Sequence, residues 1–97
     1  MTATLVFTEK RPFGRGRVEI VIWRVPQPVP PSAHRFKYRM VYVVAGRRVI
    51  GFDNERGKGD HQHWRGVETP YRFTTIPALL ADFWTAVKEA ANGDIDD

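Results

Sequence analysis

The stretch FKYRMVYVVAGRRVIGFDN, residues 36 to 54, decides the fold because it holds two strand-like runs joined by a tight turn. Side chains of the first run alternate, and one face would carry Phe36, Tyr38, Met40, Tyr42 and Val44. A period of two is typical of a strand with one buried face. Ala45-Gly46-Arg47 then turns the chain into the run 47 to 54. The sequence therefore predicts a β-hairpin.

Two more strands are expected before this hairpin. TLVFT (4 to 8) and RVEIVIWRV (17 to 25) are rich in β-branched and aromatic residues, and Pro12, Gly14 and Gly16 mark a turn between them. We interpret the two runs as an antiparallel pair. The second run is apolar on both faces at its centre, which indicates an interior strand.

The segment VPQPVPPSA (25 to 33) contains four prolines in six positions. Proline cannot donate a hydrogen bond to a β ladder and favours extended polyproline geometry. We therefore predict a stiff connecting loop, and a ligand for a proline-recognition domain is the alternative.

The C-terminal part predicts an edge strand and a helix. In VETPYRFT (67 to 74), Pro70 favours an edge strand or a strand that begins at Tyr71. A helix from 76 to 92 is expected from its end signals, which are Thr75 as N-cap, Pro77 in the first turn and Gly93 as the stop. Apolar residues recur at three- and four-residue spacing and would form a stripe against the sheet, namely Leu79, Leu80, Phe83, Trp84, Val87 and Ala91. The acidic tail 93 to 97 is expected to fray.

Together these elements predict one α+β domain over residues 1 to 97, an antiparallel sheet of four to five strands with the C-terminal helix across one face. The length suits a single core of two layers. The chain shows neither a signal-like leader nor a membrane-spanning run, so we expect a soluble cytoplasmic protein without a membrane role. Because cysteine is absent, a disulfide, a thiolate nucleophile and a sulfur-ligated metal are excluded.

Basic side chains dominate the folded part of the chain. The net charge is +4, but residues 89 to 97 hold four acidic and no basic side chains. The remaining residues carry fifteen basic side chains against seven acidic ones, a net charge of +8. Eleven of the fifteen are arginine, which favours bidentate contact with phosphate or carboxylate. An anionic partner is expected, either nucleic acid or an acidic protein surface, and an inert basic surface is the alternative.

The segment DNERGKGDHQHWRG, residues 53 to 66, concentrates polar chemistry. In it, Gly57-Lys58-Gly59 sets an ammonium group between two residues free to adopt positive φ, which suits an anion-binding turn. A nucleotide-binding P-loop is excluded because Phe52 stands where that motif needs a glycine and Gly59 where it needs Ser or Thr.

His61-Gln62-His63 is the more informative part of the segment. In an extended chain both imidazoles project to one face, about 6 to 7 Å apart, and could flank one phosphate or converge on one metal ion. An imidazole pKa of about 6.5 allows one neutral and one cationic ring near pH 7, as a base and acid pair requires. In RNA the neighbouring 2′-OH could then attack phosphorus, so cleavage would need neither cysteine nor metal.

These considerations give three sets of candidate residues. The catalytic set is Lys58, Asp60, His61, His63 and Arg65, in which the histidines exchange protons, Lys58 and Arg65 bind phosphate, and Asp60 or Asp53 orients a histidine or the loop. The nucleic-acid-binding set is Lys37, Arg39, Arg48, Trp64 and Tyr71. The loop-shaping set is Asp53, Asn54, Gly57 and Gly59. If Lys37 and Arg39 stand beside Arg47 or Arg48 across the hairpin, one end of the sheet carries a basic strip.

Other interpretations of the same residues stay open. A metal ion could use both histidines with Asp53, Asp60 or Glu55, although no third ligand has diagnostic spacing, and we predict no metal and no cofactor. The segment could be an ordinary hairpin loop whose histidines bond to backbone carbonyls. Trp64 and Tyr71 could stack on bases or cover the edge of the core.

The pattern from about His34 to Val87 resembles the TumE family of toxin components of bacterial toxin–antitoxin systems. The most specific part is DNxxGKGDHxH followed by ETPYxF, matched at Asp53, Asn54, Gly57, Lys58, Gly59, Asp60, His61, His63, Glu68, Thr69, Pro70, Tyr71 and Phe73. The resemblance implies a toxin encoded beside a helix-turn-helix antitoxin that binds it and suppresses its activity.

We therefore predict a toxin that acts on RNA, by metal-independent phosphodiester cleavage, as a possible endoribonuclease. Two alternatives belong to other classes. One is a non-catalytic module that binds nucleic acid or the antitoxin through its charges. The other is a metal-dependent hydrolase.

Overall fold

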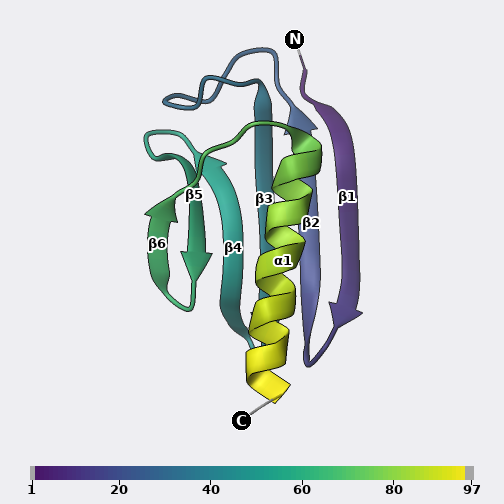
Figure 1. Cartoon of the computed structure of the whole chain (residues 1–97). Helices are drawn as coiled ribbons and strands as arrows, with labels where there is room; N and C mark the ends of the chain where they lie inside the picture. Colours follow the sequence, from purple (N-terminus) through teal and green to yellow (C-terminus); the bar gives the residue numbers. More distant parts are fainter. Residues whose placement is uncertain (1, 96–97) are drawn as a thin grey trace.

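A computed structural model describes residues 2 to 95, which form six strands and one helix (Figure 1). The elements are β1 (Thr4–Phe13), β2 (Gly16–Arg24), β3 (Phe36–Val44), β4 (Arg47–Glu55), β5 (Gly59–Trp64), β6 (Val67–Pro70) and α1 (Ile76–Ile95). The strands make one antiparallel sheet in chain order, β1-β2-β3-β4-β5-β6. The predicted α+β class is confirmed, and the expected strand count of four to five is corrected to six.

The extra strand is β5, which comes from the polar segment that could have been a loop. β4 runs on to Glu55, and the turn 56 to 58 reverses the chain, with Lys58 N donating to Glu55 O at 3.0 Å. Gly57 and Gly59 have φ of 88° and 74°, a region that glycine enters without the steric cost of a Cβ. A second turn leads from β5 into β6, an edge strand that ends at Pro70, so the alternative of a strand starting at Tyr71 is wrong.

The predicted hairpin of β3 and β4 is confirmed. Its turn consists of Ala45 and Gly46, which both have positive φ, at 53° and 76°. Two consecutive residues of this kind match the right-handed twist of the flanking strands. The register places Tyr38, Met40 and Tyr42 on the buried face, as the alternation predicts.

α1 lies along one face of the sheet and forms the core with it (Figure 1). Leu79, Phe83 and Val87 are fully buried, while Leu80 and Trp84 pack at the margin of the same cluster. Thr75 caps the helix, since its Oγ1 accepts a hydrogen bond from Ala78 N at 3.2 Å. The predicted stripe is therefore the surface that holds α1 on the sheet.

The expected end of the helix at residue 92 is wrong, because α1 continues to Ile95. Gly93 stays in the helix with no left-handed φ, and glycine permits a helix stop without enforcing one. Residues 96 and 97 of the predicted frayed tail lie outside the described residues.

The opposite face of the sheet, which we call the open face, has no helix against it within residues 2 to 95. Its side chains come from the alternate strand positions, such as Arg39 and Val41, which alternate with Tyr38, Met40 and Tyr42 of the core on the helix side. In the same range no helix has the length and apolar character needed to cross a membrane.

Candidate active site

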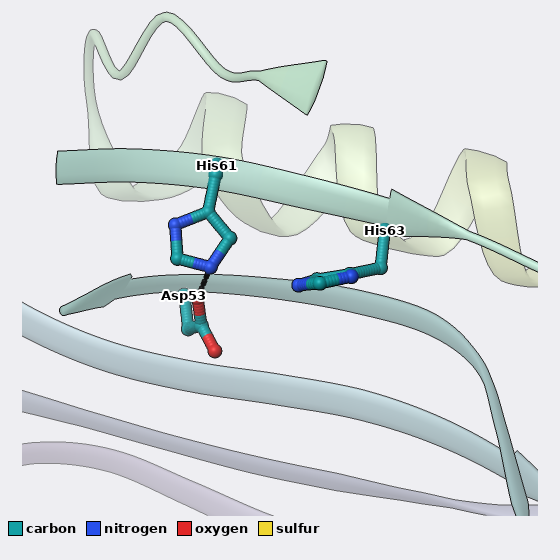
Figure 2. A group of neighbouring side chains, drawn as sticks. All are labelled: Asp53, His61 and His63. Atoms are coloured by element: carbon teal, nitrogen blue, oxygen red, sulfur yellow. Dashed lines mark ion pairs between the residues drawn. The ribbon is translucent and has the colours of Figure 1, made fainter. Parts of the chain in front are cut away.

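The pairing of β4 with β5 brings Asp53, His61 and His63 together on the open face. Asp53 stands directly opposite His61, and Gly51 stands opposite His63. The expectation that both imidazoles project to one face is confirmed, with ring centroids 5.2 Å apart and ring planes at 74° (Figure 2). The site is thus built on two adjacent strands and not on a loop.

His61 is 4% exposed, and both of its ring nitrogens are engaged. Nδ1 lies 2.9 Å from Gly59 O, and because a carbonyl only accepts, Nδ1 carries a proton. Nε2 contacts Asp53 Oδ1, and Oε1 of Glu68 lies 3.5 Å from the same nitrogen. Within residues 2 to 95 no other donor reaches Oδ1 of Asp53, so the contact is a hydrogen bond only when Nε2 carries a proton.

His63 is only partly buried and has a different environment. Nη2 of Arg48 lies 3.2 Å from Nδ1 of His63, and since a guanidinium only donates, Nδ1 is the acceptor. Burial and the positive charge of Arg48 lower the pKa of His63 below its usual 6.5, against the opposing charge of Glu68. The ring is therefore neutral at pH 7, while Nε2 lies 3.9 Å from Oε2 of Glu68.

Glycine at position 51 makes the approach of Arg48 possible. A Cβ on Gly51 would meet Cδ of Arg48 at 3.0 Å and Cβ of His63 at 3.6 Å. A glycine inside a strand often marks such a close approach. Replacing it would push the guanidinium away from the imidazole.

Glu68 and Lys58 complete the cluster at its solvent side. Glu68 pairs with His63 across β5 and β6, and 38% of its side chain is exposed. Nζ of Lys58 lies 3.8 Å from Oε2 of Glu68. An open cleft of about 380 Å³ begins there, lined by Lys58, Asp60, His61, Glu68, Thr69 and Pro70.

Asp53, His61 and His63 could also be considered as metal ligands, since their ligand atoms lie within 4.8 Å of one another. His61 fits, because a metal-binding histidine usually donates its second N–H to a carbonyl or carboxylate. His63 fits poorly. As long as Arg48 donates to Nδ1, the ring proton is on Nε2, so a metal could bind there only if Arg48 turned away.

Asp60 belongs to a separate cluster, on the other face of β5. It accepts hydrogen bonds from Ser32 Oγ at 2.5 Å, His34 Nε2 at 2.7 Å and Tyr38 Oη at 2.7 Å. Burial alone would raise the pKa of Asp60, but these three donors outweigh it and lower the pKa below its usual 3.8. The carboxylate orients a histidine, but that histidine is His34, a residue absent from the predicted set.

The remaining predicted residues are dispersed. Arg65 sits in the turn between β5 and β6, and its Nη2 lies 3.7 Å from where a Cβ on Gly93 would be, beside the C-terminal part of α1. Trp64 and Tyr71 line a cleft on the helix side, where Tyr71 Oη donates to Asp82 at 2.6 Å. Tyr71 also packs edge-on against Phe52, so it covers the edge of the core.

The condition for a basic strip across the hairpin is not met, because Lys37 and Arg39 do not stand beside Arg47 or Arg48. The register sets Arg39 opposite Asp53, while Arg48 pairs with Val43 and Arg47 with Val44. Lys37 donates to Asn54 O at 2.5 Å. The shift of register at Tyr42 and Val43 sends Arg48 over Gly51 toward His63 instead.

The four loop-shaping residues have different roles. Asp53 and Asn54 are buried strand residues, and the Asn54 side chain holds the start of β3 through Tyr38 N at 3.0 Å and Phe36 O at 2.7 Å. Gly57 and Gly59 have the positive φ that was expected of them.

Sequence reasoning missed Glu68 and the link between Arg48 and His63. A signal for Glu68 was present in Arg65-Gly66, which adopts φ of 48° and 89°. A two-residue turn there sets residue 63 opposite residue 68 by simple pairing. No comparable signal exists for Arg48, because its position depends on an irregular register.

Comparison with known proteins agrees with the resemblance. A family model described as Toxin TumE matches residues 3 to 91, which extends beyond the stretch from about His34 to Val87 that carries the resemblance. No curated protein and no solved structure matches the chain.

Proposed function

Because the chain belongs to the TumE toxin family, and is thus the toxin component of a toxin–antitoxin system, we propose that it cleaves RNA without a metal ion. One observation carries the proposal. Nε2 of His61, Nε2 of His63 and Nζ of Lys58 all lie within 4 Å of the Glu68 carboxylate, at 3.5, 3.9 and 3.8 Å. Three nitrogen atoms around one anion are the surroundings that a phosphodiester needs, and the carboxylate stands in the place of that anion.

Glu68 can vacate this place because it lies on the edge strand β6 and is partly exposed. A phosphate that takes its position is within reach of both imidazoles. Arg48 contacts Nδ1 of His63 and would be a second cation near the phosphate, in addition to Lys58. The surplus of basic side chains attracts the polyanion to this face.

The two histidines have different hydrogen-bond partners, which suits them to the two roles of acid–base cleavage. His63 is the base, since its lowered pKa keeps the ring neutral. When Arg48 turns to the phosphate, the ring proton can move to Nδ1, and Nε2 then accepts the proton of the 2′-OH. The 2′-oxygen attacks phosphorus, the bond from phosphorus to the 5′-oxygen breaks, and His61 gives its Nε2 proton to that oxygen. The products are a 2′,3′-cyclic phosphate and a 5′-hydroxyl.

Asp53 is the positioning residue in this proposal, because its carboxylate holds the Nε2 proton of His61. Lys58 stabilises the charge that develops on the non-bridging oxygens. Asp60 and Arg65, which the sequence suggested for the same site, are given no part in it. Asp60 lines the cleft, but its carboxylate already accepts from Ser32, His34 and Tyr38, and Arg65 lies beside the C-terminal part of α1.

The partner implied by the family is an antitoxin. We propose that it is a helix-turn-helix protein encoded beside the toxin and that it blocks the cleft at Glu68. An RNA target and such a partner both belong to the cytoplasm, so the action is assigned there.

The experiment incubates the purified protein with total RNA in a chelator and maps new RNA ends. Wild type and Gln62→Ala are compared with His61→Ala and His63→Ala. Gln62 is the matched control, because it lies between the histidines but lines the cleft on the helix side. We expect discrete cyclic-phosphate ends from wild type and Gln62→Ala, and a loss of about a hundredfold or more for each histidine variant.

Three results would contradict the proposal. If both histidine variants cleave RNA at the wild-type rate, His61 and His63 are not the acid and the base. Activity that the chelator abolishes and one divalent ion restores favours the metal-dependent hydrolase. RNA that is bound but never cut favours the non-catalytic binding module.

A further inference from the structure

The open face of β1, β2 and β3 adjoins the histidine cluster and carries an aromatic side chain that no step of the proposed reaction uses. Trp23 on β2 is 37% exposed, a large fraction for a tryptophan. Large exposed apolar side chains that form a patch often mark a binding surface. Leu5, its partner across β1 and β2, is 47% exposed.

The sheet register connects Trp23 to the cluster. Directly paired residues share a face, so Val21, Arg39, Asp53 and His61 form one row across β2 to β5. Trp23 and Lys37 form the next row, two residues further along their strands. Three strand spacings and two residues put Trp23 about 16 Å from His61, on the same face.

Charge along this path is mainly positive. Lys37 is opposite Trp23, and Arg39 lies between Trp23 and the cluster. Lys10 and Arg17 stand further along the face, and the acidic Glu19 is already paired with both, at 3.8 and 2.7 Å. These contacts lower the pKa of Glu19 below its usual value, chiefly through the hydrogen bond from Arg17. The face therefore offers cations at intervals beside an exposed ring.

We propose that this part of the open face binds single-stranded RNA and that Trp23 stacks on a base a few nucleotides from the cleaved bond. The inference rests on the proposed function and deepens it by naming the substrate class. Stacking platforms and spaced cations are the two features with which proteins bind single strands. A duplex keeps its bases stacked on one another, so it cannot use Trp23 in this way.

The test measures binding of a short, fluorescein-labelled RNA of random sequence by fluorescence anisotropy. All proteins carry His63→Ala to prevent cleavage. Trp23→Ala is compared with Trp64→Ala, a matched control because Trp64 is 40% exposed but lines the cleft on the helix side. Removal of a stacking ring is expected to weaken binding at least about fivefold, and Trp23→Phe to keep binding within about twofold of the parent. Trp64→Ala should also stay within about twofold.

The inference is overturned if Trp23→Ala binds RNA as tightly as its parent, if both tryptophan variants lose equally, or if duplex RNA binds better than the single strand. Unchanged RNA binding with loss of antitoxin binding would assign Trp23 to the antitoxin instead. The two proposals fail separately. If RNA binding depends on Trp23 but the wild type cleaves no RNA, the proposed nuclease activity is wrong and the RNA-binding face stands. If the wild type cleaves RNA but neither binding nor cleavage depends on Trp23, the nuclease stands and the RNA-binding face is wrong.

Discussion

Two histidines only two residues apart acquire different chemistry from their neighbours. His61 is fixed between a backbone carbonyl and a buried carboxylate, whereas His63 faces a guanidinium that favours the neutral ring. Alternation along a strand predicts that both lie on one face. The groups that pair with them give the two rings different surroundings, and those of His63 favour its neutral form.

At the residue scale we expect Arg48→Gln to change the pH dependence of cleavage. Removing the positive charge stabilises the protonated ring, so the pKa of His63 rises from its lowered value. A base acts only when deprotonated, and the acid limb of the pH–rate profile should therefore move to higher pH. Activity at mildly acidic pH should fall several-fold more than at mildly alkaline pH.

The profile is measured on purified protein with one RNA substrate. Arg47→Gln is the control, because Arg47 precedes Arg48 but pairs with Val44 at the hairpin turn. An acid limb that stays in place in Arg48→Gln would show that His63 is not the base.

At the scale of elements, the proline-rich loop before β3 supports the strand that carries the histidines. Pro30 O accepts a hydrogen bond from Gly57 N at 2.8 Å. Pro31 lies so close to Gly59 that a Cβ added there would be 3.1 Å from its Cγ. Ser32 and His34 both donate to Asp60 of β5. The ring of His34 also stacks on Phe73, with centroids 3.8 Å apart. The loop is thus part of the structure that holds β5 in place.

We expect Asp60→Asn to destabilise the fold at pH 7 by about 2 to 3 kcal/mol, because an amide cannot accept from three donors as a carboxylate does. The pKa of Asp60 is lowered in the folded state. Its contribution is therefore present above the unfolded pKa, near 3.8, and disappears as the pH falls through the lower folded value. The difference in free energy of unfolding between wild type and Asp60→Asn should therefore become smaller as the pH falls below about 3.8.

Urea unfolding at neutral and at strongly acidic pH measures this difference. Asp82→Asn is the control, since Asp82 accepts one exposed hydrogen bond from Tyr71 and should cost less than about 1 kcal/mol. Equal effects of the two substitutions would contradict the role of Asp60.

On the scale of the whole molecule, the two faces of the sheet carry different kinds of side chain. α1 packs on the apolar face and forms the core with it (Figure 1). The histidine cluster and Trp23 lie on the open face. No residue of α1 is needed for the proposed chemistry. Core substitutions should therefore lower stability and leave the remaining folded protein active.

We expect Phe83→Ala to lower the free energy of unfolding by about 3 to 5 kcal/mol, since Phe83 is fully buried between α1 and the sheet. This is a large part of the roughly 5 to 15 kcal/mol that is usual for a small domain, about a fifth or more. Phe7→Ala, at a 37% exposed position on the edge strand β1, should cost less than about 1.5 kcal/mol. Chemical denaturation compares the two, and similar losses would contradict this view of the core.

Local patterns determined much of the fold because they arise from neighbours in the chain. The alternation in residues 36 to 44 and the Ala45-Gly46 turn predicted the hairpin, and the apolar stripe of residues 79 to 91 predicted the packing of α1. β5 was not predicted because its side chains are mostly polar and lack the alternation of apolar and polar residues that marks a strand on a core. The end of α1 was misplaced because glycine allows a stop that the chain does not use here.

The sequence by itself determined the hairpin, the helix and its buried stripe, and the family. Only the tertiary structure decided that Asp53, Arg48 and Glu68 surround the two histidines of β5 and that Asp60 and Arg65 do not. The reason is physical. Periodicity follows from backbone geometry within one strand, whereas contacts between strands depend on the register and on turns such as Arg65-Gly66, where a shift of one residue moves a side chain to the other face.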